Sequence, residues 1–335
     1  MYDVITLGEP LIRFEPSNQY ERLERSDLLR MALGGAEINV TAALSNIGKL
    51  KTAIITKLPN NPLGRWVEHF LNSYNVSTEF ISYGGLRVGT YYSEQGSRPR
   101  AASVTYDRKH SSFLELSIND YIFDGSQLAK VFHTTGITLA LHENIRNTAF
   151  EMIKAFKKSN TLISFDVNYR ANLWSEEEAR TSIERILPYV DILFISEETC
   201  RKMFQRTGSL EKILEEFANM YNIKIIASTQ RKVINQAHHQ FSSVIFDSSN
   251  CIFYNSAQAY DIEVVDRVGS GDAYIAGVLY GLLNNSFDCQ IAQEYDDAFS
   301  ALKCTIPGDI LISNKQEIET IIQKHKKGIN DDINR

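Results

Sequence analysis

The amino-acid sequence predicts an α/β fold with a mainly parallel central sheet, and three observations lead to that prediction. Short, nearly continuous apolar runs such as TAIITKL and DILFIS recur along the chain. Segments with apolar residues at helical spacing separate most of these runs. Hydrophobic residues make up 43% of the 335 residues and charged residues 23%, which is typical of a globular protein with a large core. Apolar strands that alternate with helices form parallel sheets covered on both faces.

The N-terminal elements follow this alternation. DVITLG, close to the N-terminus, is the first strand. An apolar stripe from Val40 to Ile47 predicts a helix that ends at Gly48. TAIITKL is the second strand, and a second stripe, from Leu63 to Tyr74, predicts another helix.

The stretch from Leu86 to Ser112 does not follow this alternation of apolar strands and helices. It reads LRVGTYYSEQGSRPRAASVTYDRKHSS, which is polar, aromatic and basic and alternates like the strands of a hairpin. We interpret this stretch as an insertion beyond the main sheet and as a candidate lid over a site.

The C-terminal half returns to short apolar runs, which are VFHTTGI, TLISFDVN, DILFIS and KIIAST. Val264 and Val265 suit the end of a strand, and apolar residues at helical spacing follow Gly271. No linker rich in Pro, Gly or Ser divides the chain, so a single domain over residues 1–335 is expected. Residues 324–335 are highly charged, which predicts a frayed tail.

Charge and cysteine content narrow the classes of function. The net charge of −6 argues against a nucleic-acid or anionic-membrane partner. The four cysteines form no CxxC pair, which predicts free thiols in a reducing cytoplasm and not a disulfide framework or a zinc site. The start, MYDVITLGEP, has no signal-peptide pattern, and no run is long and apolar enough to span a bilayer.

The stretch VVDRVGSGDAYIAG places glycines where a helix is about to begin. Gly269, Ser270 and Gly271 would form the first turn, which carries unpaired backbone N–H groups and the positive end of the helix dipole. Glycines let a ligand approach such a turn closely, so the turn suits an anion. Asp272 makes sense there as a base that takes a proton from a hydroxyl attacking a phosphate. The alternative is a glycine-rich loop with Asp272 as a simple helix cap.

A second glycine-rich stretch, LGGAEINVTAALSNIG, follows the first strand and its polar loop. Gly34 and Gly35 allow close approach of a ligand, and Asn39 lies at the start of a helix. The sequence has no Walker A loop and no dinucleotide fingerprint after the first strand. A phosphate-handling enzyme would therefore need another architecture.

Together the two stretches resemble the signature motifs of the ribokinase-like (PfkB) carbohydrate kinases. The N-terminal motif of that family has a Gly-Gly pair followed by Asn. The C-terminal motif is Asp-x-x-Gly-x-Gly-Asp, matched here by Asp266, Gly269, Gly271 and Asp272. The resemblance covers nearly the whole chain.

This resemblance implies a three-layer α/β/α core with a mainly parallel sheet and a small β-sheet lid, the lid formed by residues of about 9–33 and 86–112. It also implies transfer of the γ-phosphate of ATP to a sugar hydroxyl. Asp272 would be the catalytic base, and Gly269, Ser270 and Gly271 would form the anion hole.

GEPLIRF, GGAEINVT, SFDVNYRANLWS and CTIPGD are most similar to the subgroup of this family that phosphorylates 2-keto-3-deoxygluconate. Such a sugar acid carries a carboxylate, which the planar fork of an arginine matches. Arg108 lies in the presumed lid, and Arg170 follows a strand end, where the site of an open α/β sheet is expected. The resemblance implies substrate contacts from eight residues: Gly34, Gly35, Asn39, Tyr91, Tyr106, Arg108, Asn168 and Arg170.

The segment expected to bind the nucleotide differs from the family pattern. KIIAST leads to QRKVINQAHHQ, which has no glycine where many family members carry Gly-x-x-Gly. The predicted nucleotide contacts are Ser228, Thr229, Gln230, Gly269, Gly271 and Asp309.

The Asn-x-x-Glu motif of the family, tied to magnesium and phosphate, falls at SEET. Ser196 therefore replaces Asn, and Thr199 replaces Glu. No protein ligand to a metal is predicted. Mg²⁺ would arrive bound to ATP, with a contact through water to Glu197 or Glu198 as the alternative.

Three functions stay open from the sequence. The first is an ATP-dependent kinase that phosphorylates the terminal hydroxyl of 2-keto-3-deoxygluconate to 2-keto-3-deoxy-6-phosphogluconate. The second is a fructokinase or another neutral-sugar kinase. The third is a kinase-like sugar-binding or regulatory protein with little turnover, against which the intact Asp272 argues. Because lids can pair through exposed strand edges, a homodimer is the expected assembly.

Overall fold

The computed structural model describes residues 1–123 and 125–328. Its large sheet has the strand order β13-β12-β11-β10-β9-β8-β1-β4-β5, and β14 pairs with β12 outside this order. From β11 to β5 all neighbouring strands are parallel, whereas β12 pairs antiparallel with its three neighbours. The strands are β1 (Tyr2–Leu7), β4 (Thr52–Leu58), β5 (Ile81–Tyr83), β8 (Ala129–Thr135), β9 (Leu162–Asp166), β10 (Ile192–Phe194), β11 (Ile225–Asn235), β12 (His238–Asp247), β13 (Ile252–Asn255) and β14 (Tyr260–Glu263).

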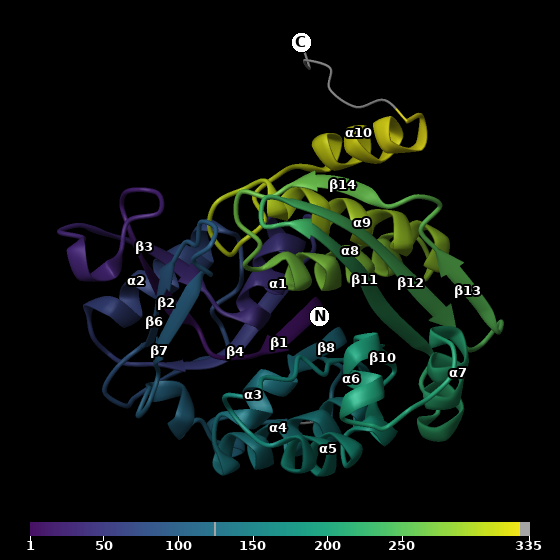
Figure 1. Ribbon diagram of the computed structural model, residues 1–335. Coiled ribbons are helices and arrows are strands. Elements are labelled where there is room, and N and C mark those ends of the chain that lie inside the picture. The colour runs from purple at the N-terminus through teal and green to yellow at the C-terminus, as the bar shows by residue number, and fades with distance from the viewer. Residues whose placement is uncertain (124, 329–335) are drawn as a thin grey trace.

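Helices cover both faces of this sheet (Figure 1). One face carries α1 (Ala36–Asn46), α8 (Ser270–Asn284), α9 (Cys289–Cys304) and α10 (Lys315–Lys326). The other carries α3 (Gly136–Ala140), α4 (Glu143–Lys158), α5 (Glu176–Glu184), α6 (Glu197–Lys202) and α7 (Leu210–Tyr221). Strand β1 packs against both layers of helices, because Val4 lies in the core beneath α1, α8 and α9, and Ile5 lies in the core on the opposite face. The predicted three-layer fold is confirmed.

A separate small sheet lies beside the large one, in the order β3-β2-β6-β7. Its strands are β2 (Leu11–Pro16), β3 (Leu29–Gly34), β6 (Gly89–Glu94) and β7 (Ser103–Asp107). Strand β2 pairs in parallel with β6, so that Arg13 lies opposite Tyr91. Helix α2 (Pro62–Ser73) packs near these strands, against a cluster that includes Ile12 and Leu58. Short 3-10 turns occur at Leu23–Arg25, Ser112–Glu115, Ile118–Asp120 and Leu187–Tyr189.

Three boundaries differ from the sequence predictions. Strand β14 ends at Glu263, before Val264 and Val265. Strand β11 continues well past KIIAST and forms a long hairpin with β12, because their backbones stay paired as far as Asn235 and His238. Helix α10 includes residues 324–326 of the expected tail, and residues 329–335 lie outside the described residues. No described helix has the length and apolar character needed to cross a membrane.

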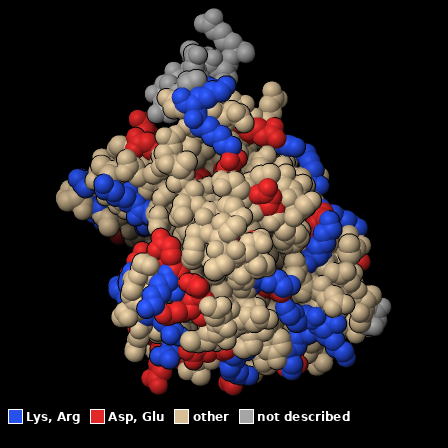
Figure 2. Space-filling model, turned by 90° about the vertical axis from the view of Figure 1, so that its right-hand side faces the viewer, with Lys and Arg blue, Asp and Glu red and all other residues tan. Residues whose placement is uncertain are grey.

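The antiparallel end of the large sheet faces the viewer in Figure 2. In Figure 1 this side carries β13 and α7. The middle of the face is a broad area without Lys, Arg, Asp or Glu, and charged side chains lie around it. Strand β13 is the edge strand here, and its Ile252 is exposed.

Candidate active site

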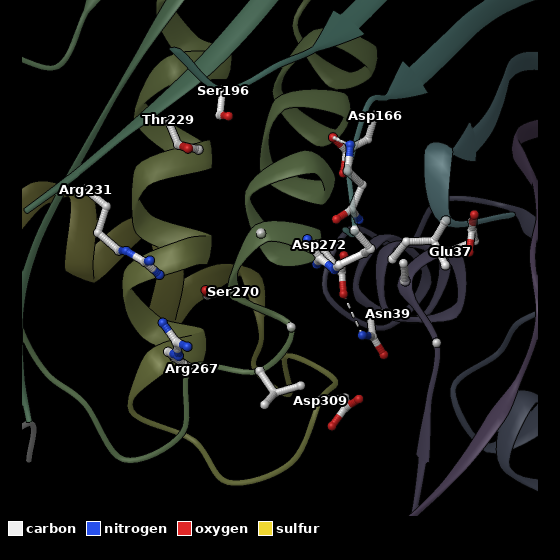
Figure 3. A pocket seen from close by; sticks show the side chains of 18 of the residues that line it. Glu37, Asn39, Asp166, Ser196, Thr229, Arg231, Arg267, Ser270, Asp272 and Asp309 are labelled. Carbon is white, nitrogen blue, oxygen red and sulfur yellow. Dashed lines mark hydrogen bonds between the residues drawn. The ribbon is translucent and has the colours of Figure 1, made fainter. Parts of the chain in front are cut away.

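A cleft of about 1090 Å³ lies at the carboxyl ends of the parallel strands, between the large sheet and the small one. Asp166 at the end of β9, Thr229 in β11, Asn39 in α1 and Asp272 in α8 all line it. In a parallel sheet the carboxyl ends of neighbouring strands lie at one edge, which brings these distant segments together. Figure 3 shows their side chains converging on this space.

The start of α8 forms the floor of the cleft. Gly269 is the N-cap residue with a left-handed φ of 80°, and a Cβ there would lie 1.9 Å from the Asp309 carbonyl oxygen. Only glycine fits this position. A Cβ on Gly271 would meet nothing within 4 Å, so a ligand can approach the backbone there. The Ser270 N–H donates to the Arg267 carbonyl at 3.2 Å, so this amide of the predicted anion hole already has a partner.

Asp272 does not cap the helix, so the alternative interpretation from the sequence is wrong. The N-cap residue makes no side-chain hydrogen bond, and the Asp272 Oδ2 atom instead accepts from Asn39 Nδ2 at 2.6 Å (Figure 3). Burial, with a smaller contribution from the Asp309 and Glu37 carboxylates, raises the pKa of Asp272 to about 7, although the Asn39 hydrogen bond opposes the shift. A carboxyl group with this pKa can accept a proton near neutral pH.

Two further carboxyl groups lie near Asp272, and the sequence analysis did not select either. Burial and the charge of Asp272 raise the pKa of Asp166 to about 7, while its Oδ1 atom accepts from the Asn168 N–H at 3.1 Å. Glu37 is buried, and its Oε1 atom accepts from the Thr135 N–H and from the hydroxyls of Thr135 and Thr138. Burial also raises the pKa of Glu37. The site therefore brings three carboxyl groups with raised pKa values together.

The two predicted carboxylate-binding arginines differ in their partners. The Arg108 Nε atom donates to Glu9 Oε2 at 2.8 Å, and its Nη2 atom contacts the same oxygen. The charge of Arg108 is therefore balanced within the protein. Arg170 is exposed and donates only to the Tyr169 carbonyl, at 3.2 Å, with no ion pair among the residues that the structure describes. Arg170 is therefore the one of the two without a salt bridge, although its charge lowers the pKa of Asp166 and of Asp272.

The side chain of Asp309 contacts the small sheet, while its backbone packs against Gly269. Its Oδ1 atom pairs with Arg13 Nη1 at 2.7 Å, and its Oδ2 atom accepts from the Tyr91 hydroxyl. A Cβ on Gly34 would lie 2.5 Å from the same Oδ2 atom. Gly34 is therefore required by packing between the sheets, not by the approach of a ligand. The Tyr91 hydroxyl donates to Asp309, which leaves the Tyr91 oxygen able to accept one further hydrogen bond.

Arg13 links Asp309 to the loop that precedes α8, because it pairs with carboxylates in both places. Its side chain is 1% exposed, and it pairs with Asp266 at 2.9 Å and with Glu15 at 2.7 Å in addition to Asp309. Asp266 in turn accepts from the Val268 N–H at 3.0 Å and from the Gly308 N–H at 3.1 Å. A buried arginine of the small sheet thus fixes both loops that border the anion hole.

The other end of the cleft is basic. Thr229 and Gln230 line it, as predicted, but Ser228 is buried and does not. Arg231 and Arg267 also line this end, and the sequence analysis selected neither. Arg267 lies inside the Asp-x-x-Gly-x-Gly-Asp motif, where its position could have drawn attention. Arg231 gave no local signal, because only the long β11–β12 hairpin brings it to the cleft.

Ser196, Glu197 and Glu198, from the segment considered for contact with Mg²⁺, line the cleft. Ser196 caps α6, accepting from the Thr199 N–H, while Glu197 and Glu198 pair with Arg201 and Lys202 of the same helix. Residues 1–123 and 125–328 contain no cluster of three or more His, Cys, Asp or Glu side chains suited to a metal. Mg²⁺ held mainly by a nucleotide would suit this donor set, and Asp166 and Glu198 are carboxylates that line the same cleft.

The structure brings most of the predicted residues to one cleft. Those that line it are Gly35, Asn39, Tyr91, Tyr106, Arg108, Asn168, Arg170, Thr229, Gln230, Gly269, Ser270, Gly271, Asp272 and Asp309. Gly34 and Ser228 do not line it. The lining residues that the sequence analysis missed include Glu9, Glu37, Asp166, Arg231 and Arg267.

Comparisons with known proteins agree with this arrangement. The family model described as "pfkB family carbohydrate kinase" matches residues 1–299. The chain is 31% identical over 327 residues to the 2-dehydro-3-deoxygalactonokinase of Haloferax volcanii, with 98% of each chain covered. The crystal structure of 2-dehydro-3-deoxygluconokinase from Thermotoga maritima superimposes with a TM-score of 0.90 at 35% identity, covering 96% of this chain and 98% of that one.

A carbohydrate kinase of the same family from Listeria grayi gives a TM-score of 0.89 at 33% identity, covering 96% of this chain and 99% of the other. The family match and the full-length relatives agree with the two glycine motifs and with Asp272 at the end of the second one. The chain therefore belongs to the pfkB family of carbohydrate kinases.

Proposed function

We propose that this protein transfers the γ-phosphate of ATP to the terminal hydroxyl of 2-keto-3-deoxygluconate. The observation that carries the proposal is the Asp272 carboxylate, bonded to Asn39 in the first turn of α8, in a cleft shared with Gly35 and Arg170. A carboxylate in that place can take a hydroxyl proton beside amides suited to a phosphoryl group. The relatives named for 2-dehydro-3-deoxy sugar acids support this class of substrate.

In the proposed reaction, the two substrates bind at different ends of the cleft. The sugar lies near Asn39, Tyr91 and Arg170, and the nucleotide lies at the basic end. Asp272 removes the proton as the sugar oxygen attacks phosphorus, the bond to the β-phosphate oxygen breaks, and ADP leaves. The Gly271 backbone and the dipole of α8 stabilise the transferring group. Mg²⁺ bound with the nucleotide would neutralise phosphate charge.

An ADP-release assay with 2-keto-3-deoxygluconate and ATP tests this function. Turnover with the sugar acid well above that with D-fructose is the expected result. The 4-epimer, 2-keto-3-deoxygalactonate, should be run beside it, because one relative is named for that sugar. ADP release from neither acid, or an equal rate with fructose, would contradict the proposal.

Arg170 is expected to bind the carboxylate of the sugar. Replacing Arg170 by glutamine should lower kcat/KM for the sugar acid by about 10- to 100-fold, because a charge-assisted hydrogen bond contributes about 1.5–3 kcal/mol. Activity on a neutral sugar should change far less. Arg180→Gln is the matched control, because Arg180 forms an exposed pair with Glu184 within its own helix. Equal losses on acidic and neutral sugars would remove Arg170 from carboxylate binding.

Activity is expected to rise with pH through about 7. Asp272 acts only when deprotonated, and its pKa lies at about 7, above its ordinary value of 3.8. Profiles of kcat/KM for the sugar, measured with Mg²⁺ in excess, report the free enzyme. Glu37→Gln should move the acidic limb to lower pH, because the Glu37 carboxylate contributes to the raised pKa of Asp272. A flat profile between pH 5.5 and 8.5 would contradict this assignment of the base.

The raised pKa of Asp272 also makes the stability of the folded protein depend on pH. A carboxyl group whose pKa is raised on folding binds its proton more tightly in the folded protein, so its contribution to stability is present below the ordinary pKa. That contribution is lost as the pH rises through about 7. Stability therefore falls as the pH rises from about 3.8 to about 7, and the full cost of burying the ionised Asp272 is present at the pH at which it becomes an active base.

A further inference from the structure

Two arginine side chains line the basic end of the cleft. Arg231 comes from β11, and Arg267 comes from the loop between β14 and α8. Both line the cleft together with Ser270. Figure 3 shows both guanidinium groups directed toward the space beside Ser270, where α8 begins. Two chain segments that are far apart in sequence thus place like charges next to the first turn of a helix.

Neither charge is balanced by the protein. The side chains of Arg231 and Arg267 form no ion pair or hydrogen bond with any residue in 1–123 or 125–328. Burial and the charge of Arg267 lower the pKa of Arg231, which reflects the repulsion between the two groups. Four arginines elsewhere behave differently, because each pairs with a carboxylate within 3.0 Å; they are Arg87, Arg146, Arg180 and Arg201. An uncompensated pair calls for an anion that carries more than one charge.

The two arginines differ in how firmly they are held. The loop of Arg267 is fixed by Asp266, which accepts from the Val268 N–H and pairs with the buried Arg13. Arg231 lies on the part of β11 where side chains are exposed. A group held in place before the reaction stabilises developing charge best, whereas a less constrained one contributes mainly to binding. Arg267 also lies only two residues before Gly269, at the anion hole.

We propose that Arg231 and Arg267 form the phosphate-binding site of the phosphoryl donor, in place of a glycine-rich Gly-x-x-Gly turn. This inference rests on the proposed kinase function and names the residues that recognise the donor. The planar guanidinium binds phosphate oxygens through two parallel hydrogen bonds, and two such groups match the charge of a polyphosphate. Arg231 contributes chiefly to affinity for the polyphosphate. Arg267 also stabilises the charge on the phosphoryl group during transfer.

The test begins with binding and not with turnover. Arg231→Gln, Arg267→Gln and the double variant are titrated calorimetrically with ADP, with inorganic pyrophosphate and with adenosine. Each single variant should weaken binding of ADP and of pyrophosphate by about 10-fold or more, and binding of adenosine should stay unchanged. The wild-type affinity for pyrophosphate should also fall more steeply with salt than that of the double variant. Arg180→Gln serves as the control for loss of one positive charge.

Thermal unfolding without ligand separates this role from a structural one. Removing one of two repelling charges should leave the melting temperature unchanged or raise it. A structural arginine would lower it. In steady-state kinetics, Arg267→Gln should lower kcat by about 100-fold or more, and Arg231→Gln should mainly raise KM for ATP.

The outcomes distinguish this inference from the proposed function. Unchanged binding of ADP and pyrophosphate to both single variants would overturn the phosphate site, even if the wild type phosphorylates the sugar acid. If binding of pyrophosphate depends on both arginines but no sugar acid is phosphorylated, the phosphate site stands and the proposed substrate is wrong. A large fall in melting temperature for both variants, without ligand, would also count against the site.

Discussion

Replacing Asp272 by asparagine is expected to lower kcat by about 10²- to 10⁴-fold, the usual contribution of a positioned general base. Asparagine keeps the shape of the side chain and an oxygen that can accept from Asn39 Nδ2, so the KM for the sugar should stay close to that of the wild type. Steady-state kinetics with saturating ATP measure both quantities. Asp261→Asn is a suitable control, because Asp261 is exposed and pairs with His238 outside the cleft.

Stability provides a second test of the same substitution. Burial is the largest cause of the raised pKa of Asp272, so the ionised form is costly to hold in the folded protein above pH 7. Asp272→Asn should therefore unfold at the same or a higher temperature than the wild type at pH 8. Turnover that remains within a few fold of the wild type would contradict the role of Asp272 as the base. A large loss of stability would instead identify Asp272 as a structural residue.

Replacing Arg13 by methionine is expected to destabilise the protein by about 3–5 kcal/mol, because two buried carboxylates lose their partner. Asp266 and Asp309 are 8% and 5% exposed, and both face the 1% exposed Arg13. Urea denaturation at pH 7.5 measures the difference. Arg180→Met removes an exposed pair with Glu184 and should change stability by no more than about 1 kcal/mol.

The effect of Arg13→Met should shrink as the pH falls. Burial already raises the pKa of Asp309, and the Arg13 charge opposes that shift. Without Arg13 the Asp309 carboxyl would bind a proton more readily, and the protonated form needs no cation. The difference in free energy of unfolding from the wild type should therefore be smaller at pH 5.5 than at pH 7.5. A difference below 1 kcal/mol at pH 7.5 would show that Arg13 is not needed to hold the two loops.

Local patterns in the sequence predicted the elements and the centre of the site. TAIITKL coincides with β4, and the run after the glycines coincides with α8, because apolar spacing and glycine placement act within a few residues. The same applies to Asp272, whose place in the first turn of a helix follows from the glycines before it. Such features depend on backbone hydrogen bonds between near neighbours, and a sequence displays them directly.

Local patterns in the sequence could not identify the partner of each buried charge. Arg108 is balanced by Glu9, 99 residues away, and Asp309 is held by Arg13, 296 residues away. Likewise, Arg231 reaches the cleft only because β11 continues into a long hairpin with β12. Pairing of this kind depends on the register between strands and on the packing of the two sheets. The sequence by itself determined the fold class and the place of Asp272 in the glycine-rich first turn of a helix, while the tertiary structure decided which charges have a partner within the protein and which do not.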